Sequence, residues 1–364
     1  MYGSCADSPL LPPSPELTRR ALLAAGWLER SVAATGGKGS SHSFSPFWGW
    51  AGAYPETSGY LIETFFALAD RLGLSQFRAC AFATADWLLS QQMADGSFPG
   101  LLAGSGRPSA FNTAQILFGL LRAADAAAQS APAARYLHSA ERALLWLKAQ
   151  FEPDYSWRRH TYARGYSPTY HVRALWPMAE AAQRLGDAQA LEMARKALAL
   201  YLTRAQSDGY PLHAGFRPAQ APFTHTLAYA AEGFWHCGVL LGEPRGQEAA
   251  VRILDALRRC VERDGRLAGR YGPGWLPDLR FACLTGEAQL SLMWRRVGLV
   301  LGREDFLRLA DASLGRCIAW QHAGRIPGMR GALPGSAPIW GPYLRFRYPN
   351  WGVKFLTDAL LERL

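Results

Sequence analysis

Two glutamates stand at the start of segments that are otherwise almost entirely apolar. Glu56 lies in the phrase PETSGY, and Glu287 lies in CLTGEAQL. Two carboxyl groups on opposite sides of a cleft can act as acid and base on a glycosidic bond, and their separation decides between retention and inversion. Because an acid near a helix N-terminus is also stabilised by the helix dipole and by capping, each glutamate has a purely structural interpretation as well.

A second group of residues combines histidine, tyrosine and arginine. Tyr170 and His171 come just before one apolar segment, with Arg173 close behind them, and His225 begins the next such segment. A histidine or tyrosine that moves a proton beside an arginine-neutralised carboxylate suits proton abstraction from a uronate. These residues therefore favour a uronate-polysaccharide lyase or a C5-epimerase as an alternative to a hydrolase. A histidine held by structural hydrogen bonds is the competing interpretation.

The segments that carry these residues belong to an internal repeat. A turn built on Asp-Gly or a similar pair recurs at Asp95, Asp154, Asp208, Asp264 and Gly324, at intervals of 54 to 60 residues. A constant interval of this size indicates one supersecondary unit used several times. Each turn follows a segment in which apolar residues recur three or four apart, which predicts a helix with one solvated face. With a similar segment at the start of the chain, these helices are expected at 15–32, 77–92, 135–151, 190–206, 248–263 and 304–321.

A second set of helical segments alternates with the first. Each follows a loop rich in Gly, Pro and aromatic residues, begins with small and polar residues, and then becomes apolar nearly all round, which predicts burial. These helices are expected at 56–73, 112–125, 169–187, 225–243, 285–303 and 350–364. Six hairpins of this kind can close into a ring with the buried set inside. We therefore predict an all-α fold, an (α/α)6 toroid, as a single domain at 15–364 after an N-terminal tail at 1–14.

This architecture resembles the toroid shared by six-hairpin glycosidases, several polysaccharide lyases and epimerases, and the terpenoid cyclase and prenyltransferase repeat proteins. In such a ring, the loops that lead into the inner helices line one open end together with the first helical turns. Glu56, Glu287, His171, His225 and Tyr170 are the catalytic candidates at this end. Its other polar and aromatic positions suit the apolar faces and polar rims of sugar rings. The substrate-binding candidates are Trp48, Trp50, Tyr60, Asn112, Gln115, Arg173, Tyr229, Trp275, Arg280, Gln289, Arg345, Asn350 and Trp351.

Two short phrases carry a narrower resemblance. PETSGY and CLTGEAQL are similar to the repeat starts of proteins that are encoded with bacterial exopolysaccharide and capsule genes and carry prenyltransferase and squalene-oxidase repeats. That resemblance implies a role beside polysaccharide biosynthesis, in association with its enzymes. The phrase DGSFPG at Asp95 resembles the aromatic turns of squalene-type cyclases. Neither the Asp-x-Asp-Asp acid nor an Asp-rich diphosphate motif occurs, so a terpenoid cyclase is the least favoured alternative.

Composition restricts the partners. The net charge of +10, from 39 Lys and Arg against 29 Asp and Glu, predicts an anionic partner if part of it lines the mouth of the ring. No basic run or nucleic-acid motif is present, which argues against nucleic acid. The six cysteines are scattered without a C-x-x-C pair, which argues against a zinc site and fits a reducing compartment. No apolar run has the length of a membrane span, and no signal-peptide pattern is seen. We expect a cytoplasmic protein without metal or cofactor.

The function expected from these observations is hydrolysis of a bacterial oligo- or polysaccharide of anionic type by the carboxylate pair Glu56 and Glu287. The lyase or epimerase that would use His171, His225 and Tyr170 is the first alternative. A non-catalytic glycan-binding or scaffold protein of polysaccharide biosynthesis is another, because the sequence contains no single unmistakable catalytic motif.

Overall fold

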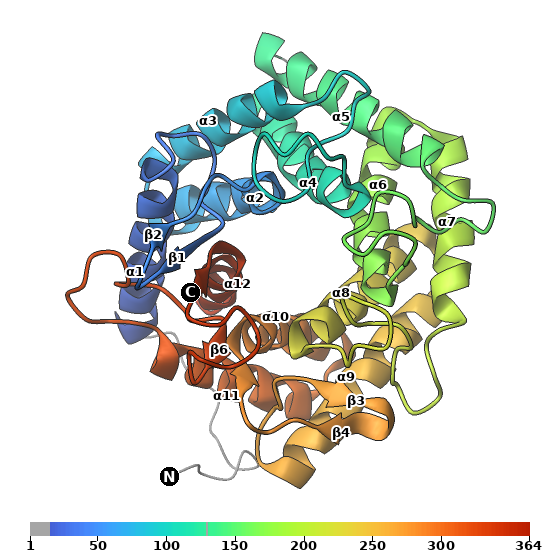
Figure 1. The fold of residues 1–364 in the computed structure, drawn as a ribbon. Coiled ribbons are helices and arrows are strands. Elements are labelled where there is room, and N and C mark those ends of the chain that lie inside the picture. The colour runs from blue at the N-terminus through green and yellow to red at the C-terminus, as the bar shows by residue number, and fades with distance from the viewer. Residues whose placement is uncertain (1–14, 129) are drawn as a thin grey trace.

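The computed structural model describes residues 15–128 and 130–364, so the predicted tail at 1–14 lies outside this part of the chain. Within these residues, twelve helices form a closed ring of hairpins, which confirms the predicted (α/α)6 toroid (Figure 1). The inner helices are α2 (Pro55–Leu72), α4 (Ala110–Ala127), α6 (Val172–Leu185), α8 (Thr224–Leu241), α10 (Leu284–Leu301) and α12 (Asn350–Leu361). The outer helices are α1 (Pro15–Ala33), α3 (Gln76–Gln91), α5 (Ala131–Ala149), α7 (Ala188–Leu202), α9 (Pro244–Asp264) and α11 (Glu304–Trp320).

Short antiparallel strands and 3-10 helices connect the loops at one end of this ring. Strands β1 (Ser43–Ser45), β2 (Gly49–Trp50) and β7 (Tyr348–Pro349) form one sheet in the order β2-β1-β7. Because β1 and β7 come from the two ends of the repeat, their pairing and the packing of α12 against α1 and α2 close the ring. The other elements are β3 (Tyr271–Gly272), β4 (Leu276–Pro277), β5 (Ala282–Cys283), β6 (Ser336–Ala337), η2 (Thr169–His171) and η3 (Pro273–Trp275).

The recurring aspartates act as turn residues after the outer helices. The Asp95 carboxylate accepts hydrogen bonds from the backbone N of Ser97 at 3.0 Å and from its Oγ at 2.6 Å. Asp154 makes the same pair of bonds to Ser156, at 3.1 and 2.7 Å. A side chain that binds the backbone two residues ahead fixes the chain direction in a turn. The repeated aspartate therefore sets where each chain segment leaves its outer helix toward the next inner helix.

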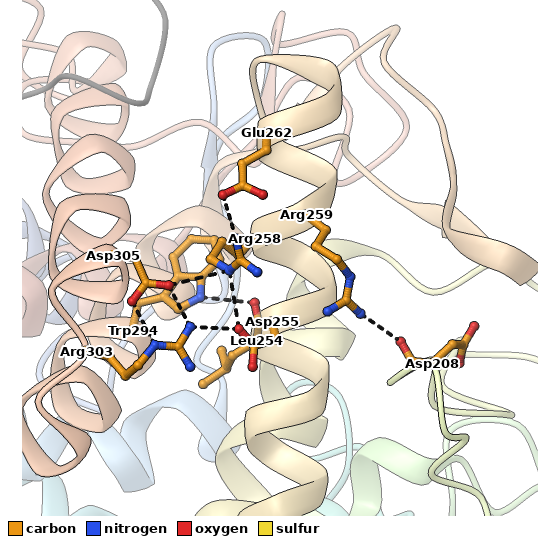
Figure 2. Close-up of polar contacts among 9 residues, drawn as sticks. All are labelled: Asp208, Leu254, Asp255, Arg258, Arg259, Glu262, Trp294, Arg303 and Asp305. Atoms are coloured by element: carbon orange, nitrogen blue, oxygen red, sulfur yellow. Dashed lines mark hydrogen bonds and ion pairs between the residues drawn. The ribbon is translucent and has the colours of Figure 1, made fainter.

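The outer helices show the expected division between a buried and a solvated face. On α9, Leu254 is buried and its carbonyl accepts a hydrogen bond at 3.3 Å from Trp294 Nε1 of inner helix α10 (Figure 2). The next residue, Asp255, lies on the outside and accepts a bond at 2.8 Å from Arg303, just before α11. Partly exposed ion pairs of this kind contribute little to stability, so burial of the apolar faces holds the hairpins together.

Inner helices α2 and α4 approach each other closely at two glycines. A Cβ added to Gly119 would lie 2.2 Å from the carbonyl oxygen of Gly59, and one added to Gly59 would lie 2.6 Å from Ile116 Cα. Backbone atoms on both sides leave no room for relaxation. Farther round the ring, a Cβ on Gly286 of α10 would lie 2.5 Å from the backbone N of His225. Glycine therefore allows the inner helices to converge near the predicted site.

We expect Gly119→Ala to lower the free energy of unfolding by about 1–3 kcal/mol, because overpacking a rigid contact forces backbone shifts. The matched control is Gly315→Ala in α11, where an added Cβ meets nothing within 4 Å. Denaturant unfolding of both variants tests the close contact. A Gly119→Ala protein as stable as the control would contradict it.

Among the described residues, none of the helices has both the length and the apolar character needed to cross a membrane.

Candidate active site

The loops that lead into the inner helices surround a cavity of about 660 Å³, here called the front cavity. Aromatic rings and imidazoles supply most of its walls. Its charged side chains are Glu56 at the start of α2 and two arginines, Arg107 and Arg217, which are exposed. Its other polar and aromatic lining residues include His42, Tyr54, Phe111, Asn112, Tyr162, Tyr170, His171, Phe216, Gln220, Phe223, His225, Tyr229, Tyr343 and Trp351.

Glu56 is the single carboxylic acid among the described residues that line the front cavity. It is 9% exposed, and Tyr54 donates its hydroxyl hydrogen to Glu56 Oε2 at 2.7 Å. Burial raises the pKa of Glu56 to about 7, although the Tyr54 hydrogen bond and the charge of Arg173 oppose this rise. A carboxyl group with such a pKa can give or accept a proton near neutral pH.

Three histidines line the same cavity in their neutral form. Burial lowers the pKa of His171 and of His225 to about 3, and that of His42 to about 4. Nδ1 of His225 lies 2.5 Å from Oε1 of Gln289. Because the amide oxygen accepts, Nδ1 carries the hydrogen and Nε2 keeps its lone pair. In this tautomer, Nε2 of His225 is free to accept a hydrogen bond.

Aromatic contacts fix the remaining walls. His171 stacks on Phe111 with ring centroids 5.5 Å apart, and Tyr170 makes edge contacts with Phe111 at 5.4 Å and with Phe216 at 5.6 Å. Burial raises the pKa of Tyr170 well above its usual value, so its phenol keeps its proton. Trp351 donates from Nε1 to the Tyr343 hydroxyl at 2.8 Å. These rings offer rigid apolar faces together with hydroxyl groups, which suits the binding of a sugar.

The structure places part of the predicted site in the front cavity. Of the catalytic candidates, Glu56, Tyr170, His171 and His225 line it, and so do the substrate-binding candidates Asn112, Tyr229 and Trp351.

Other candidates lie behind this wall. Tyr60 and Gln115 are fully buried inside the ring, and Asn350 donates to Ser31 Oγ at 2.6 Å. Gln289 supports His225 from behind, and Arg173 faces the other end of the ring.

The aromatic and arginine candidates of the long loops are spread over the rest of the loop end. Trp50 packs on Trp27, and Trp275 packs on Tyr210, at centroid distances of 4.9 and 5.4 Å. Trp48 is 73% exposed at the tip between β1 and β2 and does not line the front cavity. The last two arginines are held locally: Arg280 pairs with Asp278, and Arg345 donates to the Trp340 carbonyl.

Glu287 requires a correction, because it does not line the front cavity. Its side chain is 2% exposed and points to outer helix α11, where Arg316 Nε donates to Glu287 Oε2 at 2.7 Å. The expected pair of carboxylates across one cleft is therefore not formed by Glu56 and Glu287.

Several residues of the cavity were not predicted from the sequence. His42 lies between Tyr54 and Trp351, with both ring centroids 4.9 Å away, and Phe216 and Arg217 come from the loop before α8. Arg107 comes from the loop before α4. All of these loops lead into inner helices. The predicted candidates came mainly from the residues nearest the first helical turns. Extending the prediction to the whole of each loop would have included these residues.

The described residues contain no cluster of three or more His, Cys, Asp or Glu that could hold a metal ion. The cysteines at 80, 237, 260, 283 and 317 are free thiols.

Comparison with known proteins finds likeness in structure alone. No protein family matches the sequence, and no curated relative matches it. An unsaturated glucuronyl hydrolase from Bacillus sp. GL1, responsible for the degradation of glycosaminoglycan, superimposes with a TM-score of 0.72 at 15% identity, over 95% of this chain and 96% of that one. A heparin-specific unsaturated glucuronyl hydrolase gives 0.70 at 13% identity, over 96% of each chain. The cellobiose 2-epimerase of Bacillus thermoamylovorans gives 0.67 at 11%, over 95% of this chain and 100% of that one. This chain therefore shares the complete (α/α)6 toroid of these enzymes.

Proposed function

We propose that this protein is a carbohydrate-active enzyme that binds the end of an anionic oligosaccharide in the front cavity and protonates it with Glu56. One observation carries the proposal: the cavity holds a single carboxyl group among its described residues, and the pKa of that group is about 7. A group with this pKa keeps a substantial protonated fraction at neutral pH and can act as a general acid.

The single carboxyl group among the described residues of the front cavity favours one class of substrate. Hydrolysis of an ordinary glycosidic bond generally uses two carboxyl groups, one as acid and one as base or nucleophile. A sugar with a carbon–carbon double bond beside its ring oxygen needs mainly a proton donor, because the ring oxygen stabilises the cation that protonation creates. Unsaturated glucuronyl hydrolases are among the structural neighbours, and we extend their substrate class to this chain.

In the proposed reaction, Glu56 gives its proton to the alkene carbon, and water adds to the neighbouring carbon. The ring then opens to a ketone, and the hemiacetal that results releases the rest of the oligosaccharide. Tyr54 donates to Oε2 of Glu56 and so leaves Oε1 to carry the proton that is transferred. The water gives up a proton that restores the acid.

The mouth of the cavity supports an anionic substrate. Arg107 and Arg217 are exposed there, and the guanidinium of Arg217 lies 5.9 Å from the ring centroid of Tyr162. Positive charge at a concave mouth raises the local concentration of an anion. Tyr162 and Phe216 add aromatic faces on which a sugar ring can stack.

The neutral imidazoles support a second candidate function, epimerisation at the carbon next to a sugar carbonyl. His225 keeps a lone pair on Nε2 and could remove a proton, and His171, whose Nδ1 has no hydrogen-bond partner, could return one after taking it from water. Cellobiose 2-epimerase is among the structural neighbours. The same side chains would serve a uronate lyase or C5-epimerase.

Turnover of a substrate panel by wild type and His225→Asn tests these candidates against each other. The panel contains an unsaturated glucuronyl disaccharide, saturated uronate oligosaccharides and cellobiose. Loss of alkene absorbance that survives His225→Asn supports the proposed hydrolase. Epimerised or newly unsaturated products that disappear in His225→Asn favour the histidine chemistry. Binding without turnover would favour a glycan-binding scaffold and would overturn the proposal.

We expect Glu287→Gln to keep turnover of the unsaturated disaccharide within about twofold of wild type. Its carboxylate binds Arg316 outside the front cavity, so the change should instead lower the free energy of unfolding by about 1–3 kcal/mol. Initial rates and denaturant unfolding on the same preparation separate the two effects. A large loss of turnover in a stable Glu287→Gln protein would return this residue to the active site.

Three broader assignments belong to the proposal. We place a single toroid domain at 15–364, and we place the protein in the cytoplasm, where its buried free cysteines would stay reduced. Association with enzymes of polysaccharide biosynthesis is supported by the phrases PETSGY and CLTGEAQL.

A further inference from the structure

A second cavity, of about 270 Å³, lies at the opposite end of the ring, toward the C-terminal ends of the inner helices. We call it the rear cavity. Its lining side chains come from inner helices on every side of the ring, among them Glu63 of α2, Phe118 of α4 and Arg173 of α6. A cavity of this volume can hold a ligand of about the size of one monosaccharide.

One polar group of the rear cavity lacks the partner that burial normally requires, and a second, the partly exposed Glu63, has an open carboxylate. Arg173 is 2% exposed and donates from Nε to Glu232 Oε2 at 2.6 Å, but its Nη1 has no hydrogen-bond partner. The Glu63 carboxylate forms no ion pair with any of the described residues, and burial raises its pKa. Because buried polar groups are normally hydrogen-bonded, the free donor of Arg173 indicates a ligand with an acceptor group, and Glu63 offers an acceptor to the same ligand.

Two other cationic side chains of the rear cavity are paired with carboxylates, and a third, at its edge, is not. Arg296 pairs with Glu362 and Lys354 pairs with Asp358, both at 2.6 Å. Arg71 is exposed; its Nη1 donates to the Leu361 carbonyl at 2.7 Å, and no described carboxylate pairs with it. An unpaired guanidinium beside a small cavity favours an anionic group on the ligand.

We propose that the rear cavity is a second ligand site that binds a small sugar acid, of the size of one hexuronate. Its carboxylate binds Arg71, and its hydroxyl groups accept from Arg173 Nη1 and donate to Glu63. A hydroxyl group can do both, whereas phosphate at neutral pH and simple carboxylates serve mainly as acceptors. The site does not depend on the chemistry proposed for the front cavity.

Only one layer of side chains separates the two cavities. Arg173 lines the rear cavity, and its guanidinium carbon lies 4.6 Å from the ring centroid of Tyr229, which lines the front cavity. Because a uronate could also enter the front cavity, the test needs two variants. One removes an arginine beside the rear cavity, and the other removes an arginine beside the front cavity. Arg71 and Arg107 form a matched pair, both exposed and each beside one cavity.

Calorimetric titration of the full chain with glucuronate, glucose and inorganic phosphate tests the site without any turnover. We expect glucuronate to bind, and Arg71→Gln to weaken this binding by about tenfold or more, as loss of a charge-assisted hydrogen bond requires. Glu63→Gln should weaken it too, whereas Arg107→Gln should leave the rear site unchanged. Glucose should bind more weakly than glucuronate.

Three results would overturn the proposal. They are an absence of glucuronate binding to wild type, an affinity that Arg71→Gln leaves unchanged, and glucose or phosphate binding as tightly as glucuronate. If Arg107→Gln alone abolishes binding, glucuronate occupies the front cavity and the rear site is refuted.

Discussion

Replacement of Glu56 by glutamine is expected to lower kcat for an unsaturated glucuronyl disaccharide by about 10²–10⁴-fold, the usual contribution of general acid catalysis. The amide is nearly the same shape as the acid, and its oxygen can still accept the hydrogen bond that Tyr54 now gives to Oε2. The geometry of the cavity and KM should therefore change little. Initial rates from the loss of alkene absorbance measure the effect.

The matched control for this variant is Glu304→Gln, because the side chain of Glu304 is 84% exposed on an outer helix. It should behave as wild type. A Glu56→Gln protein that keeps kcat within a few-fold of wild type would place the acid elsewhere.

The pH dependence of the reaction follows from the same carboxyl group. Burial raises the pKa of Glu56 to about 7, and the protonated form is the active one in our proposal. The rate should therefore fall as pH rises through about 7. Tyr54→Phe removes a hydrogen bond that lowers this pKa, so the falling limb should move to higher pH in that variant. This shift distinguishes an effect on proton transfer from simple damage to the cavity.

The second large effect is expected on stability, from Arg173→Met. Arg173 and Glu232 form a buried pair at 2.6 Å, with side chains 2% and 9% exposed. Removing one partner of such a pair leaves a buried charge and costs about 3–5 kcal/mol of unfolding free energy. Adding Glu232→Gln should recover part of this loss. Denaturant unfolding of the single and double variants measures both.

An exposed pair provides the control. Arg308 and Glu304 have side chains 42% and 84% exposed, so Arg308→Met should cost less than about 1 kcal/mol. If Arg173→Met costs no more than this control, the buried pair does not contribute to stability as proposed.

The charge of Glu232 also gives the pair a pH dependence. Burial alone would raise the pKa of Glu232, but the charge of Arg173 and its hydrogen bond outweigh burial and hold the pKa below its usual value. A carboxylate with a lowered pKa contributes stability above its unfolded-state pKa and loses that contribution as pH falls through the folded-state value. The free energy of unfolding of wild type should therefore fall in acid, as Glu232 becomes protonated. In Arg173→Met, the charge of Arg173 no longer opposes the effect of burial on the pKa of Glu232. That variant should therefore lack this contribution already at neutral pH.

The ring itself could be predicted from the sequence because its cause is local and repeated. Apolar residues three or four apart define each helix, and the aspartates at 95, 154 and 208 set the turns. The same repeat predicted that the loops entering the inner helices gather at one end, where Glu56, His171 and His225 do line one cavity.

Glu56 and Glu287 differ in the direction in which each side chain points around its helix. If Tyr60 and Gln289 are taken as equivalent positions, Glu56 lies four residues before the first, and Glu287 lies two residues before the second. At 3.6 residues per turn, four residues keep the same face, whereas two turn the side chain to the opposite one. Glu287 therefore faces α11 and Arg316 instead of the cavity. Alignment of the repeats in the sequence is therefore enough to predict that the two glutamates point in different directions.

The depth of a residue in the ring could not be predicted in the same way. The sequence aligns Tyr60, Gln115, Arg173 and Tyr229 as equivalent, yet only Tyr229 of these lines the front cavity, and Arg173 lines the rear one. Depth depends on how side chains from six helices meet at the axis and fill it. This depends on the combined volumes of distant residues, which no single repeat encodes.

The most direct test of the central claim is one NMR experiment on wild type with an unsaturated glucuronyl disaccharide in D₂O. If Glu56 delivers an exchangeable proton to the alkene, the alkene signals disappear, the second sugar is released, and one deuterium enters at the carbon that was protonated. An intact alkene with deuterium exchanged into a saturated carbon, or no reaction at all, would contradict the account.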